Sequence, residues 1–425
     1  MADEINEITR SKWLSALSEK GAASDVPEAL LADRTFMLEA LPLCPALFER
    51  APLEIRGDRE VALVAIKADV SNYMHIFYEL YVDEEFILRA AGVNGHLLKY
   101  VGKEYRSNAA FMLEQIRLDN DNLKYASPIL RGDKDFMLRA IGYVGEWSLT
   151  VGKPFLIYAS DALKGDRDVV LAAVGKNGMN LEYAAPELHD DREIVLAAVR
   201  ENDCALKFAS PATCSDKEIL LTAVKKNGMN LKYASPELRN DRALVLAAVK
   251  ASAEALQFAS SALKGDKEIV LAAVKQTLWI LPYASPLLLG DKEFVLRAIE
   301  QGGFDMGFAS FEVRADREVM LAAVRKNGRE LRFASEELQA DRTLVNEAIK
   351  EYDLAFEYAA PTLRDDKEFA FPLIKKTGYL LRFAGEKLRA DKEVVLAAVK
   401  QNRLAFEYAA PELQNDPDVL AACKK

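Results

Sequence analysis

A period of 25 residues constrains this chain more than any other feature. An aromatic residue followed by two small residues begins at Tyr183 and again at Phe208, and Asp followed by a base occurs at Asp191 and again at Asp216. A fixed period in this range is the signature of stacked repeats. Since each repeat contacts only its neighbours, a chain of 425 residues need not form one large core.

The acidic residue of this pattern marks every unit of the chain, and we number positions from it, so that the next residue is +1. It is replaced by Asn at one place, Asn108, and an interval of 33 instead of 25 separates Asp133 from Asp166. The markers are residues 33, 58, 83, 108, 133, 166, 191, 216, 241, 266, 291, 316, 341, 366, 391 and 416. They predict about sixteen repeats of 25 residues.

Each unit has the apolar pattern of a helix. Apolar residues at +3, +4, +5, +7 and +8, as in 194–199, form one helical stripe. We expect the marker to be the N-cap, because an Asp side chain accepts from backbone N–H groups two or three residues later. The Gly of Asn177-Gly178 is expected to end the helix in a left-handed conformation. A second segment of about two turns and a short turn beginning at Pro186 should follow, and the Ala at +7 predicts close approach of neighbouring helices.

These patterns predict an all-α solenoid in which each repeat pairs a longer helix with a short helix or turn. We expect a capping segment at 1–24, divergent repeats at 25–157 with an insertion near 142–152, and a regular array at 158–425. At about 8–10 Å per layer the stacked length would be on the order of 130–160 Å, an elongated superhelix. A compact chain of this length would have a radius of gyration of about 22 Å. Pro372, inside a first helix, predicts a bend.

The repeated motif can be written [YF]-A-[SA]-P-x-L-x-x-D-[KR]-E-x-V-L-A-A-V-[KR]-x-N-G. It is strong from Tyr158 to about Asn415 and recognisable from Asp33 onward. In these residues the chain resembles a helical repeat family catalogued as domain of unknown function 4116. The resemblance implies a helical array with an interaction role, and it implies no catalytic residues.

Composition excludes several classes of protein. A net charge of −10 disfavours nucleic acid as a partner, because phosphate backbones would be repelled. No run of eighteen apolar residues predicts a membrane span. Four cysteines without a framework indicate a cytoplasmic or other intracellular location. Export by a dedicated secretion machine, as a secreted effector, stays an alternative.

No constellation of residues predicts chemistry. His75, His96 and His189 lie in different repeats, and none has a second ligand at metal-binding spacing. Cys204 and Cys214 have no flanking base to activate a thiol. We therefore predict no catalytic, cofactor or metal site. The base at +1 is interpreted as part of an ion-pair ladder between repeats, with an anion-binding stripe as the alternative.

The most informative departure from the repeat is the apolar stretch at 278–290. Leu278 replaces Gly or Asp, while Leu287 and Leu289 replace the acidic and basic residues of other units. We predict that these three leucines belong to a partner-binding surface, with Leu287 and Leu289 as exposed anchors. Local repacking is the alternative. Trp279 stands at a position that is often apolar and is assigned to the core.

The function predicted from the sequence is that of a non-enzymatic scaffold for binding a protein or peptide. The alternative is a structural or assembly subunit of a larger complex.

Overall fold

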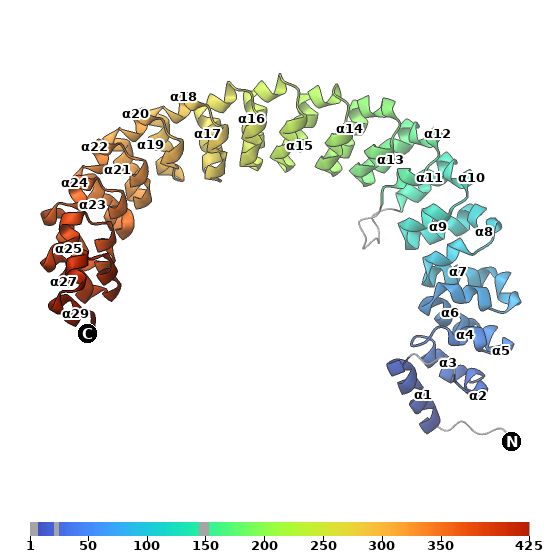
Figure 1. The fold of residues 1–425 in the computed structure, drawn as a ribbon. Helices are drawn as coiled ribbons and strands as arrows, with labels where there is room; N and C mark the ends of the chain where they lie inside the picture. The colour runs from blue at the N-terminus through green and yellow to red at the C-terminus, as the bar shows by residue number, and fades with distance from the viewer. Residues whose placement is uncertain (1–6, 21–24, 144–152, 425) are drawn as a thin grey trace. The chain divides into compact units, whose positions relative to one another are not determined.

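The computed structural model describes residues 7–20, 25–143 and 153–424. These residues form helices and turns, and no strand occurs among them. The chain divides into two compact units, residues 1–213 and residues 214–425, and in each of them a three-part repeat follows along the ribbon (Figure 1). The predicted all-α solenoid of 25-residue repeats is confirmed. The predicted boundaries after residues 24 and 157 stay a prediction.

The first part of each repeat is an α-helix that begins directly after the marker. Most of these helices have ten residues, as α21 does, and are therefore about 15 Å long. In residues 1–213 they are α3 (Arg34–Ala40), α6 (Arg59–Ala68), α7 (Glu84–Val93), α9 (Ala109–Leu118), α11 (Lys134–Gly142), α13 (Arg167–Lys176) and α14 (Arg192–Glu201). In residues 214–425 they are α15 (Lys217–Lys226), α16 (Arg242–Ala251), α17 (Lys267–Val274), α19 (Lys292–Gln301), α21 (Arg317–Lys326), α23 (Arg342–Glu351), α25 (Lys367–Lys376), α27 (Lys392–Gln401) and α29 (Pro417–Lys424).

The second part is a 3-10 helix that occupies +12 to +17 in most repeats. Six residues at 3.0 per turn give the predicted two turns, but with a tighter backbone than an α-helix. These elements are η1 (Val70–His75), η3 (Gly95–Lys99), η4 (Asn120–Tyr125), η5 (Phe155–Tyr158), η6 (Gly178–Tyr183), η8 (Asp203–Phe208), η10 (Gly228–Tyr233), η12 (Ala253–Phe258), η14 (Leu278–Tyr283), η15 (Met306–Phe308), η16 (Gly328–Phe333), η17 (Asp353–Tyr358), η18 (Gly378–Phe383) and η19 (Arg403–Tyr408), with the α-helix α4 (Leu47–Arg50) in this place in the first repeat.

The third part is a short turn of helix before the next marker, and proline often occupies its first position. These elements are α2 (Glu28–Leu31), α5 (Leu53–Arg56), η2 (Tyr78–Tyr81), α8 (Lys103–Ser107), α10 (Pro128–Arg131), α12 (Asp161–Lys164), η7 (Pro186–Asp190), η9 (Thr213–Ser215), η11 (Leu238–Asn240), η13 (Leu263–Gly265), α18 (Pro286–Leu289), α20 (Phe311–Arg314), α22 (Glu336–Gln339), α24 (Pro361–Arg364), α26 (Glu386–Arg389) and α28 (Pro411–Gln414).

The marker is the N-cap of the first helix, as predicted. Asp266 shows the geometry: its Oδ1 accepts from the N–H groups of Glu268 at 3.0 Å and Ile269 at 3.1 Å. Asn108 keeps this role, because its amide oxygen accepts from the Phe111 N–H at 3.1 Å. Each cap satisfies backbone donors that the helix itself leaves without a partner.

The prediction of a left-handed glycine after the first helix is wrong. Among the described residues Gly303 alone has a positive φ, of 102°. At Gly178 the reason for glycine is space: a Cβ there would lie 2.2 Å from the carbonyl oxygen of Ala198 in the next repeat. Gly228 would meet Ala248 in the same way, at 2.1 Å. The close approach predicted from the Ala at +7 is thereby confirmed, with glycine as the other half of the contact.

Helix α1 (Glu7–Lys20) lies in the segment at 1–24, whose capping role stays a prediction. It packs on α3, where Leu17 is buried. The Arg10 guanidinium lies 2.9 Å from the Glu39 carboxylate on α3. Helix α1 is therefore held against the first repeat by both apolar and polar contacts.

Most of the predicted insertion, residues 144–152, lies outside the described residues, but its flanks keep the repeat geometry. The Ser160 N–H donates to the carbonyl of Arg131 at 3.0 Å, the bond that joins consecutive third parts elsewhere, as from Ser260 to Arg239 at 2.9 Å. Separate unfolding on the two sides of the insertion stays a prediction.

Helix α25 is continuous from Lys367 to Lys376 although it contains Pro372. The proline side chain lies on the exposed side of the helix. Its missing N–H removes the bond to the carbonyl four residues earlier, and water can reach the group that is left. The predicted bend stays a prediction.

Candidate functional site

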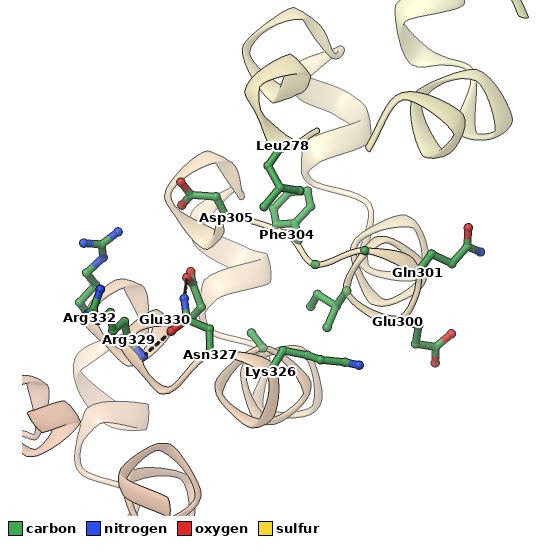
Figure 2. Close-up of a pocket in the computed structure, with 14 residues that line it drawn as sticks. Leu278, Glu300, Gln301, Phe304, Asp305, Lys326, Asn327, Arg329, Glu330 and Arg332 are labelled. Atoms are coloured by element: carbon green, nitrogen blue, oxygen red, sulfur yellow. Dashed lines mark hydrogen bonds between the residues drawn. The ribbon is translucent and has the colours of Figure 1, made fainter. Parts of the chain in front are cut away.

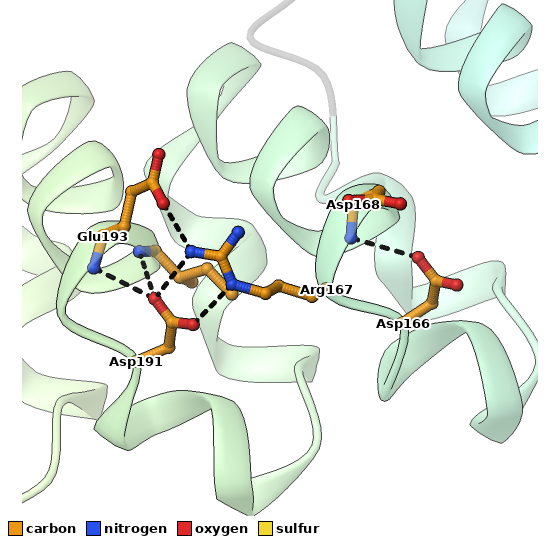
Figure 3. Close-up of polar contacts among 6 residues, drawn as sticks. Asp166, Arg167, Asp168, Asp191 and Glu193 are labelled. Atoms are coloured by element: carbon orange, nitrogen blue, oxygen red, sulfur yellow. Dashed lines mark hydrogen bonds and ion pairs between the residues drawn. The ribbon is translucent and has the colours of Figure 1, made fainter.

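An ion-pair ladder connects consecutive markers. The Arg167 Nε lies 2.8 Å from Oδ2 of Asp191 in the next repeat, and its guanidinium also contacts Glu193 (Figure 3). Asp191 Oδ1 meanwhile accepts from the Glu193 N–H at 3.0 Å. The same Oδ1 also accepts from Arg167 Nη2, at the longer distance of 3.4 Å. One carboxylate therefore serves the cap and the ladder together. The ladder predicted from the +1 base is confirmed, and these bases are already engaged.

The ladder also holds the marker carboxylates in their charged form. The hydrogen bond from Lys217, together with the Leu244 N–H, lowers the pKa of Asp241 below its ordinary value. Because these pairs are exposed, each contributes about 0–1 kcal/mol. The ladder is therefore part of the framework.

Histidine and cysteine form no site in the described part of the chain. His96 Nδ1 lies 3.1 Å from the Tyr125 hydroxyl, and His75 and His189 lie in other repeats. Cys214 is buried, and burial raises the pKa of its thiol, which lowers its reactivity. No group of three His, Cys, Asp or Glu side chains that could hold a metal ion occurs among the described residues.

A helix that crosses a bilayer needs about 20 predominantly apolar residues. Within the described ranges, none of the helices is both long and apolar enough to span a bilayer.

The three leucines predicted as a partner surface lie in three different environments. Leu287 is 89 % exposed, as expected for an anchor. Leu289 is buried at 9 %, so its assignment as an exposed anchor is wrong. Position +23 faces the next repeat: Arg364, at this position, donates from Nη1 to the Phe383 carbonyl at 3.3 Å. Leu278 is half-buried and lines a cavity.

The assignment of Trp279 to the core is also wrong, since the side chain is 88 % exposed. Position +13 lies on the outer side of the 3-10 helix. Glu254 and Arg329 stand at the same position, and both are exposed. These two charged residues were the sequence signal for an exposed position.

Leu278 lies beside a cavity of about 680 Å³ within residues 214–425 (Figure 2). Phe304 and Leu278 lie next to each other at one side, with Ile299 and Ala323 as further apolar lining. The polar lining comes from Glu300, Gln301, Asp305, Lys326, Asn327, Arg329, Glu330 and Arg332. The cavity therefore combines an apolar surface with charges of both signs.

The cavity forms because one 3-10 helix is short. Helix η15 has three residues, whereas η16 in the next repeat has six. Gly303, with its positive φ, redirects the chain after α19. A Cβ added at Gly303 would have Leu278 Cδ1 as its nearest neighbour, at 4.0 Å. At Gly328, in the regular repeat, a Cβ would lie 2.2 Å from the Ala348 carbonyl oxygen. The space that a regular turn fills is thus left open.

Glu330 supports this irregular turn. Its Oε2 accepts from the Met306 N–H at 3.0 Å, and its Oε1 accepts from Asn327 Nδ2 at 2.8 Å. Burial raises the pKa of this carboxyl above its ordinary value. Asn180 occupies the same position in its own repeat and accepts from the Leu156 N–H at 3.0 Å. Glu330 therefore joins two repeats and is not available as a free base.

Within residues 214–425, exposed large apolar side chains are concentrated on two consecutive repeats. Seven such side chains are exposed among the described residues of 214–425, and five of them lie between 279 and 311. The five are Trp279, Tyr283, Leu287, Phe308 and Phe311. We call them the exposed apolar cluster. Sequence reasoning missed Phe311, although Pro or Glu stands at its position in most repeats, as at 236 and 336.

Comparison with known proteins gives a family and no function. No curated protein matches the chain. The model of a family described as Domain of unknown function (DUF4116) matches residues 33–81, 83–131, 133–189, 166–213, 216–264, 244–289, 266–314, 316–364 and 366–414. Most of these matches begin at a marker and cover two of the 25-residue units. Since they extend over most of the chain, the protein belongs to the DUF4116 family, a repeat family of unknown function.

Proposed function

We propose that this protein is a non-enzymatic scaffold that binds a protein or peptide through the exposed apolar cluster. The observation that carries the proposal is the concentration of five exposed large apolar side chains on two repeats. Exposed apolar side chains that gather in one region are typical of interaction sites, whereas single scattered ones need no explanation.

The residue types of the exposed apolar cluster are those that contribute most to binding free energy. Aromatic side chains dominate binding hot spots, and the cluster contains Trp279, Tyr283, Phe308 and Phe311. Their backbone belongs to η14, η15 and the short helix α20, which pack on the repeat core. A rigid support of this kind lowers the entropy lost on binding.

Leu287 provides the sharpest test. Its position holds glutamate in other repeats, at Glu187, Glu237 and Glu337, so the fold accepts a carboxylate there. We expect Leu287→Glu to leave the thermal midpoint unchanged and to weaken binding of an isolated partner at least tenfold, as judged by calorimetry. The partner is obtained by photocrosslinking from position 287, with position 337 as the matched control. Unchanged affinity of the variant would contradict the proposal.

Self-association is a separate outcome of the same experiment. If the chain forms oligomers that Leu287→Glu dissolves, the cluster serves assembly, and the structural role replaces the scaffold. Light scattering of the two proteins at equal concentration decides this point.

A further inference from the structure

Two residues of this cluster, Tyr283 and Phe308, belong to a set of aromatic residues at +17 that recurs once per repeat. In residues 214–425 they are Tyr233, Phe258, Tyr283, Phe308, Phe333, Tyr358, Phe383 and Tyr408. In several repeats the base at +16 lies over the ring. Lys232 Nζ is 4.8 Å from the centroid of Tyr233, and the Arg332 guanidinium is 4.3 Å from that of Phe333. The aliphatic stem and charge of such a base cover the aromatic face.

Two neighbouring rings have lost this cover. Pro282 precedes Tyr283 and Gly307 precedes Phe308, so +16 holds neither a base nor any other long side chain in these two repeats. Repeats with Gln257, Glu357 or Glu407 at +16 also lack the base but keep a long side chain there. Both rings are 40 % exposed, while the other +17 rings of the described part of this unit are less so. We call these two rings and the exposed Trp279 side chain the ring row.

The ring row also offers hydrogen-bond donors. Neither the Trp279 indole N–H nor the Tyr283 hydroxyl has a partner among the described residues. Both groups combine an apolar face with a polar tip, which suits a ligand that has exposed backbone carbonyls.

Spacing and the two free donors together favour a polyproline II ligand. Tyr283 and Phe308 are one repeat apart, and packed helical layers are separated by about 8–10 Å. Polyproline II repeats every three residues, or about 9 Å, and its carbonyls make no internal hydrogen bonds. An α-helix places residues of one face about 5.4 or 10.5 Å apart, so the spacing suits it as well. Its carbonyls are already bonded within the helix, however, whereas those of polyproline II are free to accept from Trp279 and Tyr283. Aromatic-lined surfaces are a known means of binding such chains.

The charged side chains at the two ends of the ring row differ in sign, which would orient a bound segment. Arg329 and Arg332, in the repeat after Phe308, are exposed and lie over the rings of Tyr352 and Phe333, at 4.5 and 4.3 Å. Among the described residues neither guanidinium forms an ion pair with a carboxylate, unlike the bases of the ladder. At the other end of the ring row, position +13 holds the exposed Glu254. The surface is therefore complementary to an acidic group at the Arg end.

We propose that the ring row binds a proline-rich segment in the polyproline II conformation, with an acidic residue directed toward Arg329 and Arg332. The inference rests on the proposed scaffold function and names the chemistry of its partner. Proline rings pack on Trp279, Tyr283 and Phe308, and the two donors bind carbonyls of the segment.

The test uses the full chain and three labelled synthetic peptides, measured by fluorescence anisotropy. They are ten prolines followed by two glutamates, ten prolines followed by two lysines, and a Gly-Ser peptide followed by two glutamates. We expect the first peptide to bind at least fivefold more tightly than the second. The third should show no saturable binding.

The binding site is located with variants in which a residue of the ring row, or its neighbour, is replaced by the residue that another repeat has at the same position. Trp279→Met takes the residue found at Met229, and Pro282→Lys takes that found at Lys232, so both are expected to fold normally. Each should weaken binding of the first peptide at least fivefold. The matched controls, Leu404→Met at +13 and Gln257→Lys at +16, should leave it unchanged. Arg329→Gln with Arg332→Gln should remove the preference for glutamate over lysine.

The outcomes separate this inference from the proposed function. Absence of binding by the first peptide overturns the inference, as does binding that Trp279→Met and Pro282→Lys both leave unaltered. A helix-forming peptide that binds in its place, with dependence on Trp279, also overturns it. In each case a partner released by Leu287→Glu would leave the scaffold function standing.

Discussion

The repeats that begin at Asp291 and Asp316 are neighbours with the same cap and the same ladder, yet only the first is irregular. Lys292 pairs with Asp316 at 2.8 Å, and Arg317 pairs with Asp341 at 2.7 Å. The difference is confined to the second part of the repeat, where η15 is short and η16 complete. The comparison shows that the first helices and the ladder maintain stacking, while the 3-10 segment is free to vary.

A second comparison shows that the cap and the ladder are separable. In the first unit, Glu84 replaces the base at +1 and the next marker is Asn108. Asn108 keeps the cap and removes an acid that would face Glu84. The following residue at +1 is Ala109, so the ladder resumes only at Lys134, which lies 2.9 Å from Asp166.

The largest expected effect comes from crowding the regular turn. In Gly328→Ala the new Cβ would lie 2.2 Å from the Ala348 carbonyl, so the two repeats must move apart. We expect a loss at the upper end of about 1–3 kcal/mol in unfolding free energy, measured with denaturant. Gly175→Ala is the control, because nothing lies within 4 Å of the Cβ that this change adds. Alanine also has the higher helix propensity. Equal effects of the two changes would refute the close-approach account.

The same position in the two repeats gives a matched pair. Ala348 faces the filled interface and Ala323 lines the cavity. Ala348→Val should cost about 1–3 kcal/mol through overpacking, and Ala323→Val less than half of that. Thermal melts of the two variants measure the difference. A cost at Ala323 that matches or exceeds the cost at Ala348 would mean that the cavity cannot accept the extra methyl groups.

The N-cap is common to the two compared repeats and to the repeat that begins at Asp241, where it can be tested. Asp241→Ala removes the acceptor of the Leu244 N–H, at 2.9 Å, and should cost about 0.5–2 kcal/mol. Hydrogen exchange of α16 locates the loss. Added divalent metal should leave the midpoint unchanged, and a marked rise that Asp241→Asn abolishes would show that the markers bind metal.

The ladder contribution is smaller and depends on pH. Asp241→Asn keeps an acceptor for the cap, as Asn108 does, and should cost about 0–1 kcal/mol at neutral pH. Because the pair with Lys217 lowers the folded-state pKa of Asp241, the unfolded state binds the proton more readily. Its contribution is present above about pH 4 and is lost as the pH falls toward the folded-state value. A pH titration of stability should therefore bring wild type and Asp241→Asn together in acid, and a constant difference would be the contrary result.

The smallest effect is expected at Glu330. Burial raises its pKa, so ionisation of this carboxyl opposes folding at neutral pH. Glu330→Gln should be at least as stable as wild type at pH 7, and the two should converge as the pH falls and the carboxyl becomes protonated. Thermal midpoints at pH 7 and pH 4.5 measure this. A variant that is clearly less stable at pH 7 would mean that the charge itself holds η15 in place.

The sequence alone determined the repeat, the caps and the ladder. These depend on residues within three positions of the marker, or on the same position one period later. Asp266 reaches the N–H groups of Glu268 and Ile269 in any chain that starts a helix there. The 25-residue period then brings Arg242 to Asp266 at 2.7 Å without further information. The departures at 278–290 also lie within the repeats that carry the exposed apolar cluster.

Only the tertiary structure decided which side chains of those repeats are exposed. Leu287 and Leu289 both replace polar residues, but the packing of α18 against the next repeat exposes the first and buries the second. Trp279 is apolar and yet exposed, and Gly178 is required by a carbonyl twenty residues away. The physical reason is that burial and close approach depend on the neighbouring repeat, whereas capping and pairing follow from the local chain and its period.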